Sequence, residues 1–201
     1  MTFEINLEED NNRIDGILKW SAKGTEDGEI DKNNFYIIDD GEKKTCDLIK
    51  KKGIILDIYN MKTGYQAFAN NSSQWQWNDT LTEWKPKPGG ADSNTWKKGF
   101  SMEALAGDEI VLWIQSGYAV MHGFKNLVKT FGKNTDSKKK SPLPLVKLVG
   151  AELVKFEVGS TSVPKLEVVD WVERPFPLDL DNQGQQADPK ENDELTEVIE
   201  F

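Results

Sequence analysis

The sequence predicts a mainly β fold with one helix and an acidic C-terminal tail, and three observations support this prediction. Short runs of apolar residues recur along the chain, and in residues 153–158 they alternate with charged residues, as a half-solvated antiparallel strand requires. One convincing helix is expected, over residues 118–131, where apolar residues recur at helical spacing through several turns. Residues 179–201 carry eight carboxylates against one lysine, which is typical of a solvated segment.

Seven segments are expected to form the strands of an antiparallel sheet, since they are rich in aliphatic, β-branched or aromatic residues. They are residues 13–20, 34–38, 53–59, 109–115, 143–149, 153–158 and 165–171. In the expected helix, residues 118–131, the apolar face would consist of Val120, Phe124, Leu127, Val128 and Phe131.

A helix between the third and fourth strands of a small barrel, with long aromatic loops among the early strands, is typical of an oligonucleotide-binding (OB) barrel. The predicted fold is therefore an OB-fold-like Greek-key barrel of about five or more antiparallel strands. A two-sheet sandwich would give nearly the same periodicity and stays an alternative.

Charge divides the chain into two parts, a body of residues 1–178 and a tail of residues 179–201. The formal net charge of −9 becomes −2 without the tail. Within the body, residues 50–155 hold 16 lysines against 9 carboxylates. Charge alone would make these lysines ordinary surface, and it is the aromatic residues described below that predict a single-domain, nucleic-acid-binding body followed by a flexible acidic interaction tail.

Composition argues against several classes of protein. No run of 18 apolar residues occurs, and the N-terminus is acidic where a secretory signal would be basic and then apolar. Cys46 and His122 are single copies of their residue types, so neither an intrachain disulfide nor a Cys/His zinc cluster is expected. The expectation is a cytoplasmic protein without a metal or another cofactor and without catalytic residues.

Aromatic and basic residues are interleaved in the middle of the body. Four of the seven tryptophans lie within 22 residues dense with Asn, Ser, Gly and Pro, which predicts loop or edge positions rather than core. Flat rings beside cations suit single-stranded nucleic acid, because unpaired bases stack on the rings and cations contact the phosphates. The predicted binding residues are Tyr59, Lys62, Tyr65, Phe68, Trp75, Trp77, Trp84, Lys85, Lys87, Trp96, Lys97, Lys98 and Phe100, with Lys125 and Lys129 on the helix.

Two structural explanations compete with this interpretation. The tryptophan-rich segment could fold back as a lid over a satellite core. The lysines of the helix could equally form an ordinary solvated face.

A basic, aromatic barrel followed by an acidic tail that ends in Phe201 resembles the single-stranded DNA-binding proteins of bacteria and of tailed phages. The resemblance implies a protein that coats and protects single-stranded DNA during replication, recombination and repair, in the host cytoplasm if the gene belongs to a phage. It also implies that the tail recruits replication or recombination proteins. Phe201 would insert its ring into a partner pocket, and steering would come from Asp193, Glu194, Glu197 and Glu200.

The tail has two further interpretations. Its negative charge resembles that of a nucleic-acid backbone, so it could occupy the protein's own groove until a strand arrives. Alternatively Leu195, Val198 and Ile199, at helical spacing, could form a short helix packed on the body or on a second copy in a homodimer.

Two other functions stay open. Loop tryptophans also stack on sugar rings, which would suit a carbohydrate-binding β-sandwich. A metal-dependent nuclease could use Asp57, Asp79 or Asp92, although these carboxylates follow no motif spacing.

Overall fold

The structure is a computed structural model that describes residues 14–69, 72–81, 83–89, 95–131, 142–156, 159–175 and 178. Its strands are β1 (Gly16–Ser21), β2 (Asn34–Asp39), β3 (Glu42–Thr45), β4 (Ile54–Leu56), β5 (Lys62–Ala69), β6 (Ser72–Trp77), β7 (Lys97–Ala106), β8 (Glu109–Ser116), β9 (Leu143–Phe156) and β10 (Gly159–Val172). Its helices are α1 (Leu48–Lys51), the 3-10 turn η1 (Ile58–Asn60) and α2 (Tyr118–Phe131). The prediction of a mainly β fold is confirmed.

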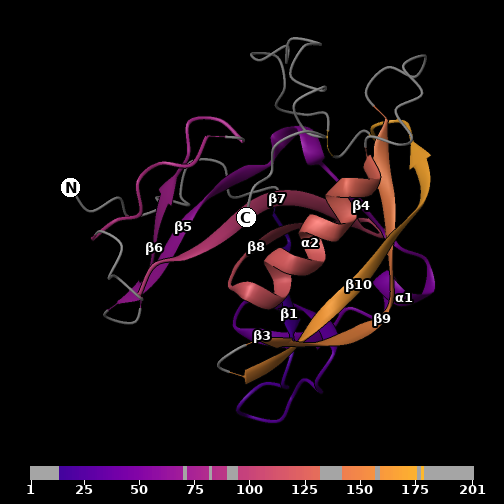
Figure 1. Ribbon diagram of the computed structural model, residues 1–201. Helices are drawn as coiled ribbons and strands as arrows, with labels where there is room; N and C mark the ends of the chain where they lie inside the picture. The colour runs from indigo at the N-terminus through magenta and orange to yellow at the C-terminus, as the bar shows by residue number, and fades with distance from the viewer. Residues whose placement is uncertain are drawn as a thin grey trace.

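The strands form one curled sheet in the order β10-β9-β4-β7-β8-β1-β2-β3, and β5 joins it by pairing with β7 and β6. Strand β7 is central, because β8 pairs along one side of it while β4 and β5 share the other side (Figure 1). The expectation of antiparallel pairing is right except for β1 and β8, which are parallel. Within the described ranges no ladder joins β3 to β10, so the sheet is a half-barrel.

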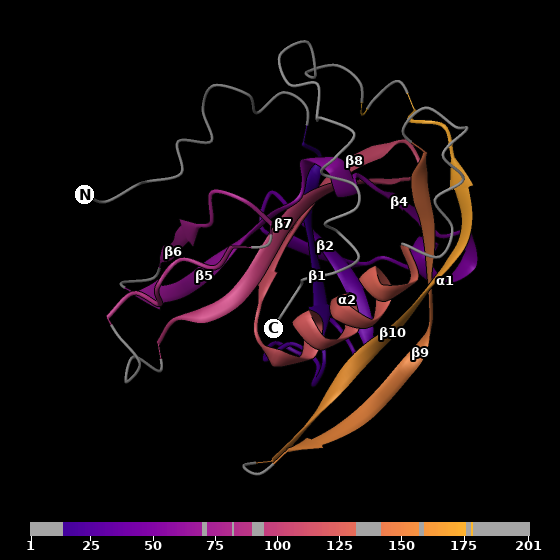
Figure 2. The same ribbon diagram turned by 45° about the horizontal axis from the view of Figure 1, so that its top comes forward.

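Helix α2 has the bounds and the apolar face that the sequence predicts, and the five predicted apolar positions are buried. It lies in front of β7 and β8 and beside β10 (Figures 1 and 2). Phe124 stacks on Phe100 of β7 with ring centroids 4.3 Å apart, and it meets Trp113 of β8 edge-on. Aromatic packing therefore fixes the helix on one face of the sheet.

The sheet has two chemically different faces. We call the face on which α2 packs the inner face; it carries Leu18, Phe100 and Trp113, all fully buried. Successive side chains of a strand point to opposite faces, so the strand register assigns the alternate residues to what we call the outer face. Near β5 these outer-face residues are Lys62, Gly64, Gln66, Phe68, Ser73, Trp75, Trp77, Lys97, Gly99 and Ser116.

The segment that the sequence predicts to be irregular is in part regular. Strands β5, β6 and the first half of β7 form an antiparallel arm, which extends to the left in Figure 1. The sequence also predicts a strand over residues 53–59, whereas β4 ends at Leu56 and η1 follows. Helix α1 is a second helix where one was expected, and β3, β5, β6 and β7 are additional strands. The two strands expected over residues 143–149 and 153–158 are parts of the single strand β9.

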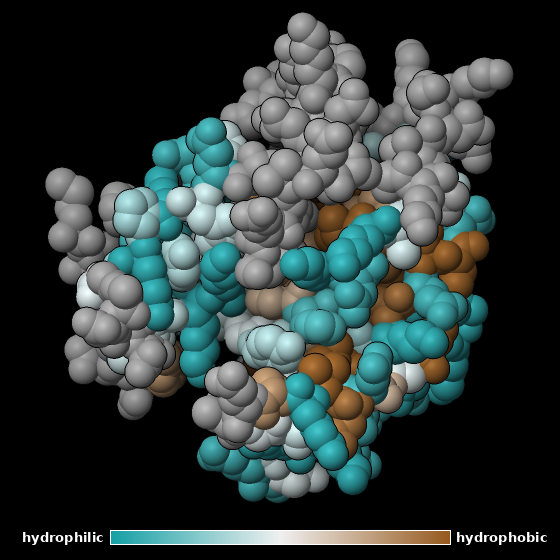
Figure 3. Space-filling view, viewed as in Figure 1, coloured by the Kyte–Doolittle hydropathy of each residue, from teal (hydrophilic) through white to brown (hydrophobic). Residues whose placement is uncertain are grey.

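The hairpin of β9 and β10 extends beyond the rest of the described chain (Figure 2). Val149, Leu153 and Val169 of this hairpin are exposed, and hydrophobic surface gathers on that side of the molecule (Figure 3). In the described part of the chain β10 pairs only with β9. The hairpin thus presents apolar side chains and unpaired backbone groups together.

None of the helices in the described ranges combines the length and the apolar character that crossing a bilayer would need. Helix α2, with 14 residues, is shorter than the roughly 20 apolar residues of a spanning helix.

Candidate nucleic-acid interface

Two tryptophans form a stacked pair on the outer face of the arm. Trp75 and Trp77 are two residues apart in β6, so both side chains point to the same side of the sheet. Their ring centroids are 4.4 Å apart and the ring planes differ by 8°. Both side chains are half-buried. The prediction of an edge position is confirmed, because β6 pairs only with β5 in the described part of the chain.

Glycines beneath the pair create the space that the indoles occupy. Gly64 of β5 pairs with Trp77 on one side and with Gly99 of β7 on the other. A Cβ atom at Gly99 would lie 2.8 Å from Cη2 of Trp75, closer than such atoms can approach. Trp75 therefore reaches across β5 and covers Gly99, which it could not do over a larger residue.

A chain of polar side chains continues from the tryptophans across the outer face. Gln66 of β5 is paired with Trp75. Its Nε2 donates a hydrogen bond to Oγ of Ser73 at 2.6 Å, and its Oε1 accepts one from Oγ of Ser116 at 2.5 Å. These contacts hold the amide of Gln66 in place between β6 and β8.

Cations border this surface. Lys62 and Lys97 are exposed, the register places them on the outer face, and neither forms an ion pair with any described residue. Lys19 of β1 also points to this face, because its neighbour Leu18 belongs to the inner core. Its Nζ donates to the carbonyl oxygen of Ile114, and burial lowers the pKa of its ammonium group to about 8.

Two of the predicted aromatic rings are not available to a ligand. Tyr65 and Phe100 are only 8% and 0% exposed and point into the inner face, which corrects the expectation that they lie uncovered. Trp84 stands edge-on to Tyr65 with centroids 5.2 Å apart, and Nζ of Lys98 lies 4.4 Å from the centroid of Trp84. Trp84 and Lys98 therefore lie on the opposite side of the arm from Trp75 and Trp77.

The remaining predicted binding residues are dispersed. Phe68, on the outer face, is 70% exposed, whereas Trp96 and Lys87 are half-buried. Tyr59 is half-buried and its ring lies near Arg174. Lys85 pairs with Asp79 at 2.6 Å. Lys125 and Lys129 belong to α2 and so lie on the inner side of the sheet.

A buried ion pair fixes the end of the body. Asp57 is fully buried, and its carboxylate accepts hydrogen bonds from Nη1 and Nη2 of Arg174 at 2.6 and 2.9 Å. Leu178 is buried against Leu105 and Ile110, two residues whose side chains point to the outer side of the sheet. The last described residue thus lies on the outer side.

The predicted tail residues Asp193, Glu194, Glu197, Glu200 and Phe201 lie outside the described residues, as does Asp92. Of the other two carboxylates considered for a nuclease, Asp57 binds Arg174 and Asp79 binds Lys85. No group of three or more His, Cys, Asp or Glu side chains in the described ranges could hold a metal ion.

Sequence reasoning missed Lys19, Gln66, Ser73 and Ser116. The alternation of glutamine and tryptophan in residues 74–77 is the signal that could have identified β6 and its outer face.

Comparison of the chain with protein-family models, with curated protein sequences and with solved structures returned no match.

Proposed function

We propose that this chain is a non-catalytic single-stranded DNA-binding protein with an OB-like half-barrel, and that it binds the strand along its outer face. The observation that carries the proposal is the stacked pair of Trp75 and Trp77 over a floor of glycines, with Lys62 and Lys97 beside it. Stacked, half-exposed indoles offer a flat surface to unpaired bases, whatever the base sequence.

The expected energetics are those of base stacking combined with phosphate neutralisation. Each base stacked on an aromatic ring contributes about 1–3 kcal/mol. Lys62 and Lys97 would contact phosphates, since neither is engaged by a carboxylate of the described chain. Such contacts release counterions and make the affinity depend steeply on salt concentration. The interface proposed here therefore contains fewer residues than the list of binding residues predicted from the sequence.

The acidic residues 179–201 complete the proposal. They follow Leu178, which is buried on the outer side of the sheet, so they begin on the side proposed for DNA. A segment with eight carboxylates would compete there with the phosphates of DNA. When DNA displaces the segment, its terminal Phe201 and neighbouring carboxylates would recruit replication or recombination proteins.

The test is a titration of the full chain with a labelled oligo-dT, followed by anisotropy and by tryptophan fluorescence. We expect fluorescence quenching, weaker binding to duplex DNA, and an affinity that falls steeply between 50 and 200 mM salt. The double variant Trp75→Ala, Trp77→Ala should lose on the order of tenfold or more in affinity, because two stacking surfaces disappear.

The matched control is Leu153→Ala, which removes an exposed apolar side chain of the hairpin and should bind like the unchanged protein. Absence of binding to oligo-dT, or binding that salt does not weaken, would refute the proposal. Quenching by a soluble polysaccharide but not by the oligonucleotide would favour the carbohydrate-binding alternative.

A further inference from the structure

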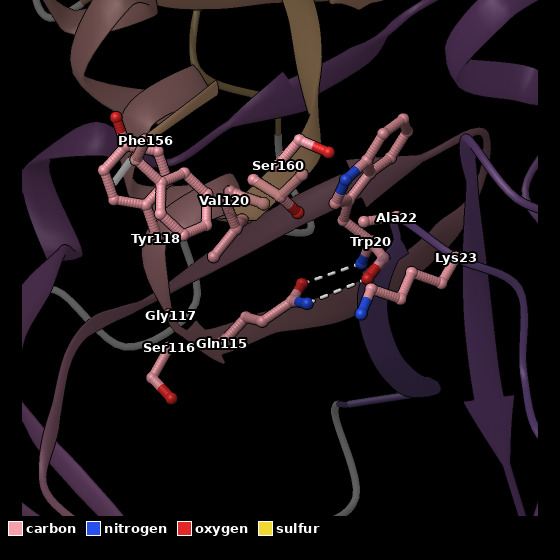
Figure 4. A pocket seen from close by; sticks show the side chains of 12 residues that line it. Trp20, Ala22, Lys23, Gln115, Ser116, Gly117, Tyr118, Val120, Phe156 and Ser160 are labelled. Atoms are coloured by element: carbon pink, nitrogen blue, oxygen red, sulfur yellow. Dashed lines mark hydrogen bonds between the residues drawn. The ribbon is translucent and has the colours of Figure 1, made fainter. Parts of the chain in front are cut away.

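A hollow of about 270 Å³ opens where the ends of β1 and β8, the start of α2 and the tip of the β9–β10 hairpin meet (Figure 4). One wall consists of the rings of Tyr118 and Phe156, whose centroids are 5.1 Å apart and whose planes differ by 43°. These rings are 51% and 39% exposed. Two large aromatic side chains thus remain open to solvent at the mouth of a cavity.

The floor of the hollow is held by hydrogen bonds. The side-chain amide of Gln115 accepts from the backbone N–H of Trp20 at 2.7 Å and donates to its carbonyl oxygen at 2.9 Å (Figure 4). Nε1 of Trp20 in turn donates to the carbonyl oxygen of Ser162 at 3.1 Å. These bonds join β1, β8 and β10, so the cavity is formed in advance of any ligand.

The lining matches the chemistry of a nucleotide. Besides the aromatic wall, the described residues that line the hollow contribute the hydroxyl groups of Ser160 and Thr161 and one cation, Lys23, but no carboxylate. Lys23 is exposed and forms no ion pair with any described residue. The volume is below the roughly 300–1,000 Å³ of sites for larger ligands, which suits a single planar ring with polar edges and an adjoining phosphate.

The hollow lies on the inner side of the sheet, beside the end of β8, because inner-face residues Trp20 and Gln115 and the start of α2 line it. Ser116 lines the hollow, and its hydroxyl group donates to Gln66. Gln66 is the residue paired with Trp75. A strand lying on the tryptophan pair would have to pass around the end of β8, at Ser116 and Gly117, to enter the hollow from the inner side.

We infer that the hollow accepts one unpaired base of the bound strand, stacked on Tyr118 and Phe156, while Lys23 contacts its phosphate. This inference rests on the proposed function and adds to it a second stacking point, separate from the arm. The contact would extend the strand's path from β6, around the end of β8, to the tip of the hairpin.

The test uses the full chain and a labelled (dT)20. The variants are Tyr118→Ala, Phe156→Ala and the double variant. Loss of one stacked base predicts about five- to a hundredfold weaker binding for the double variant. Leu153→Ala, on the same strand as Phe156 but outside the lining, should leave the affinity unchanged. Circular dichroism melting of each variant checks that the fold is retained.

A second measurement locates the base directly. An oligonucleotide that carries 5-iodouracil should crosslink to the peptide that contains Tyr118 when the complex is irradiated, and Phe156→Ala should reduce this crosslink. The crosslink is observable even if a variant binds too weakly for a reliable titration.

The outcomes separate the two proposals. If the unchanged protein binds (dT)20 and the double variant binds equally well without a crosslink at Tyr118, the hollow is not a base site, while the proposed function stands. If the unchanged protein does not bind, both proposals fail. The same substitutions are also made in a chain that ends at Leu178. If they change the affinity for (dT)20 in the full chain but not in the shortened chain, the hollow holds the acidic tail and the inference is wrong.

Discussion

Lys19 shows how one residue connects stability with charge on the outer face. Its side chain is largely buried, its ammonium group donates to the carbonyl oxygen of Ile114, and its pKa is lowered to about 8 by the loss of water around the charge. The charged form is therefore less favourable in the folded chain than in the unfolded chain, where the pKa is 10.5. A cation held at this cost in the middle of a sheet face contributes positive potential there.

The sign of the resulting pH dependence can be tested. Between about pH 8 and pH 10.5 the unfolded chain binds more protons at this position than the folded chain, so the free energy of unfolding rises with pH across that window. Below pH 8 the penalty is fully present, with an upper bound of roughly 3 kcal/mol. We expect Lys19→Met to stabilise the protein at pH 7, and the gain to shrink as the pH approaches 10.

Urea unfolding of both proteins at pH 7, 8.5 and 10 measures this difference. Comparison of the two proteins cancels the titration of the other lysines. A stability difference that is constant with pH would show that Lys19 titrates normally.

At the residue scale, sequence predicted the positions of some candidate side chains and misplaced others. Trp75 and Trp77 were predicted to lie at an edge, and they do. Tyr65 and Phe100 were predicted to flank the site, yet they are buried. All four lie in the same aromatic stretch of the sequence, residues 65–100. Only the pairing of β5 with β6 and β7 decides toward which face each side chain points.

The arm is the element on which the proposed site depends. Its hairpin of β5 and β6 has few aliphatic residues. The tryptophan pair lies over Gly64 of β5 and Gly99 of β7, which are paired across the two neighbouring strands. The geometry therefore requires a small residue at position 99, where a Cβ would also lie 2.7 Å from the carbonyl oxygen of Gln115.

Gly99→Ala is expected to disturb the arm. The added methyl group must displace Trp75 or the backbone of β8, which should cost about 1–3 kcal/mol of stability and weaken oligo-dT binding. Gly150→Ala is the matched control, because a Cβ there meets no atom within 4 Å. Thermal unfolding and anisotropy titration measure the two effects. Equal behaviour of the two variants would argue that the indoles do not depend on the glycine floor.

At the element scale, local periodicity predicted α2 correctly and missed β7. The helix has a regular apolar stripe, so its position can be read without knowledge of its partners. Strand β7 is central, with buried residues on both faces over much of its length. It therefore lacks the alternation that identifies a half-exposed strand.

At the scale of the whole molecule, the end of the body is fixed relative to the proposed binding face. Arg174 binds the buried carboxylate of Asp57, and Leu178 packs on the outer side of the sheet. The chain from residue 179 onward carries most of the net charge. Its starting point on the outer side is what makes competition between this segment and DNA geometrically reasonable.

Removal of residues 179–201 is expected to tighten the binding of single-stranded DNA, most strongly at low salt, because the formal charge rises from −9 to −2. Titrations of the full chain and of a chain ending at Leu178 measure this effect. A full-length variant in which the eight tail carboxylates are replaced by their amides is the control for length. Unchanged or weaker binding by both variants would disprove competition by the tail.

The sequence by itself determined what local pattern and composition encode: a mainly β chain, the bounds of α2 and the segregation of negative charge into residues 179–201. The tertiary structure decided which rings share a surface, so that Trp75 and Trp77 meet on the outer face while Trp84 packs on the inner side. The physical reason is that a side chain's face follows from strand register and from the partners that cover the strand, and these contacts join residues far apart in the chain.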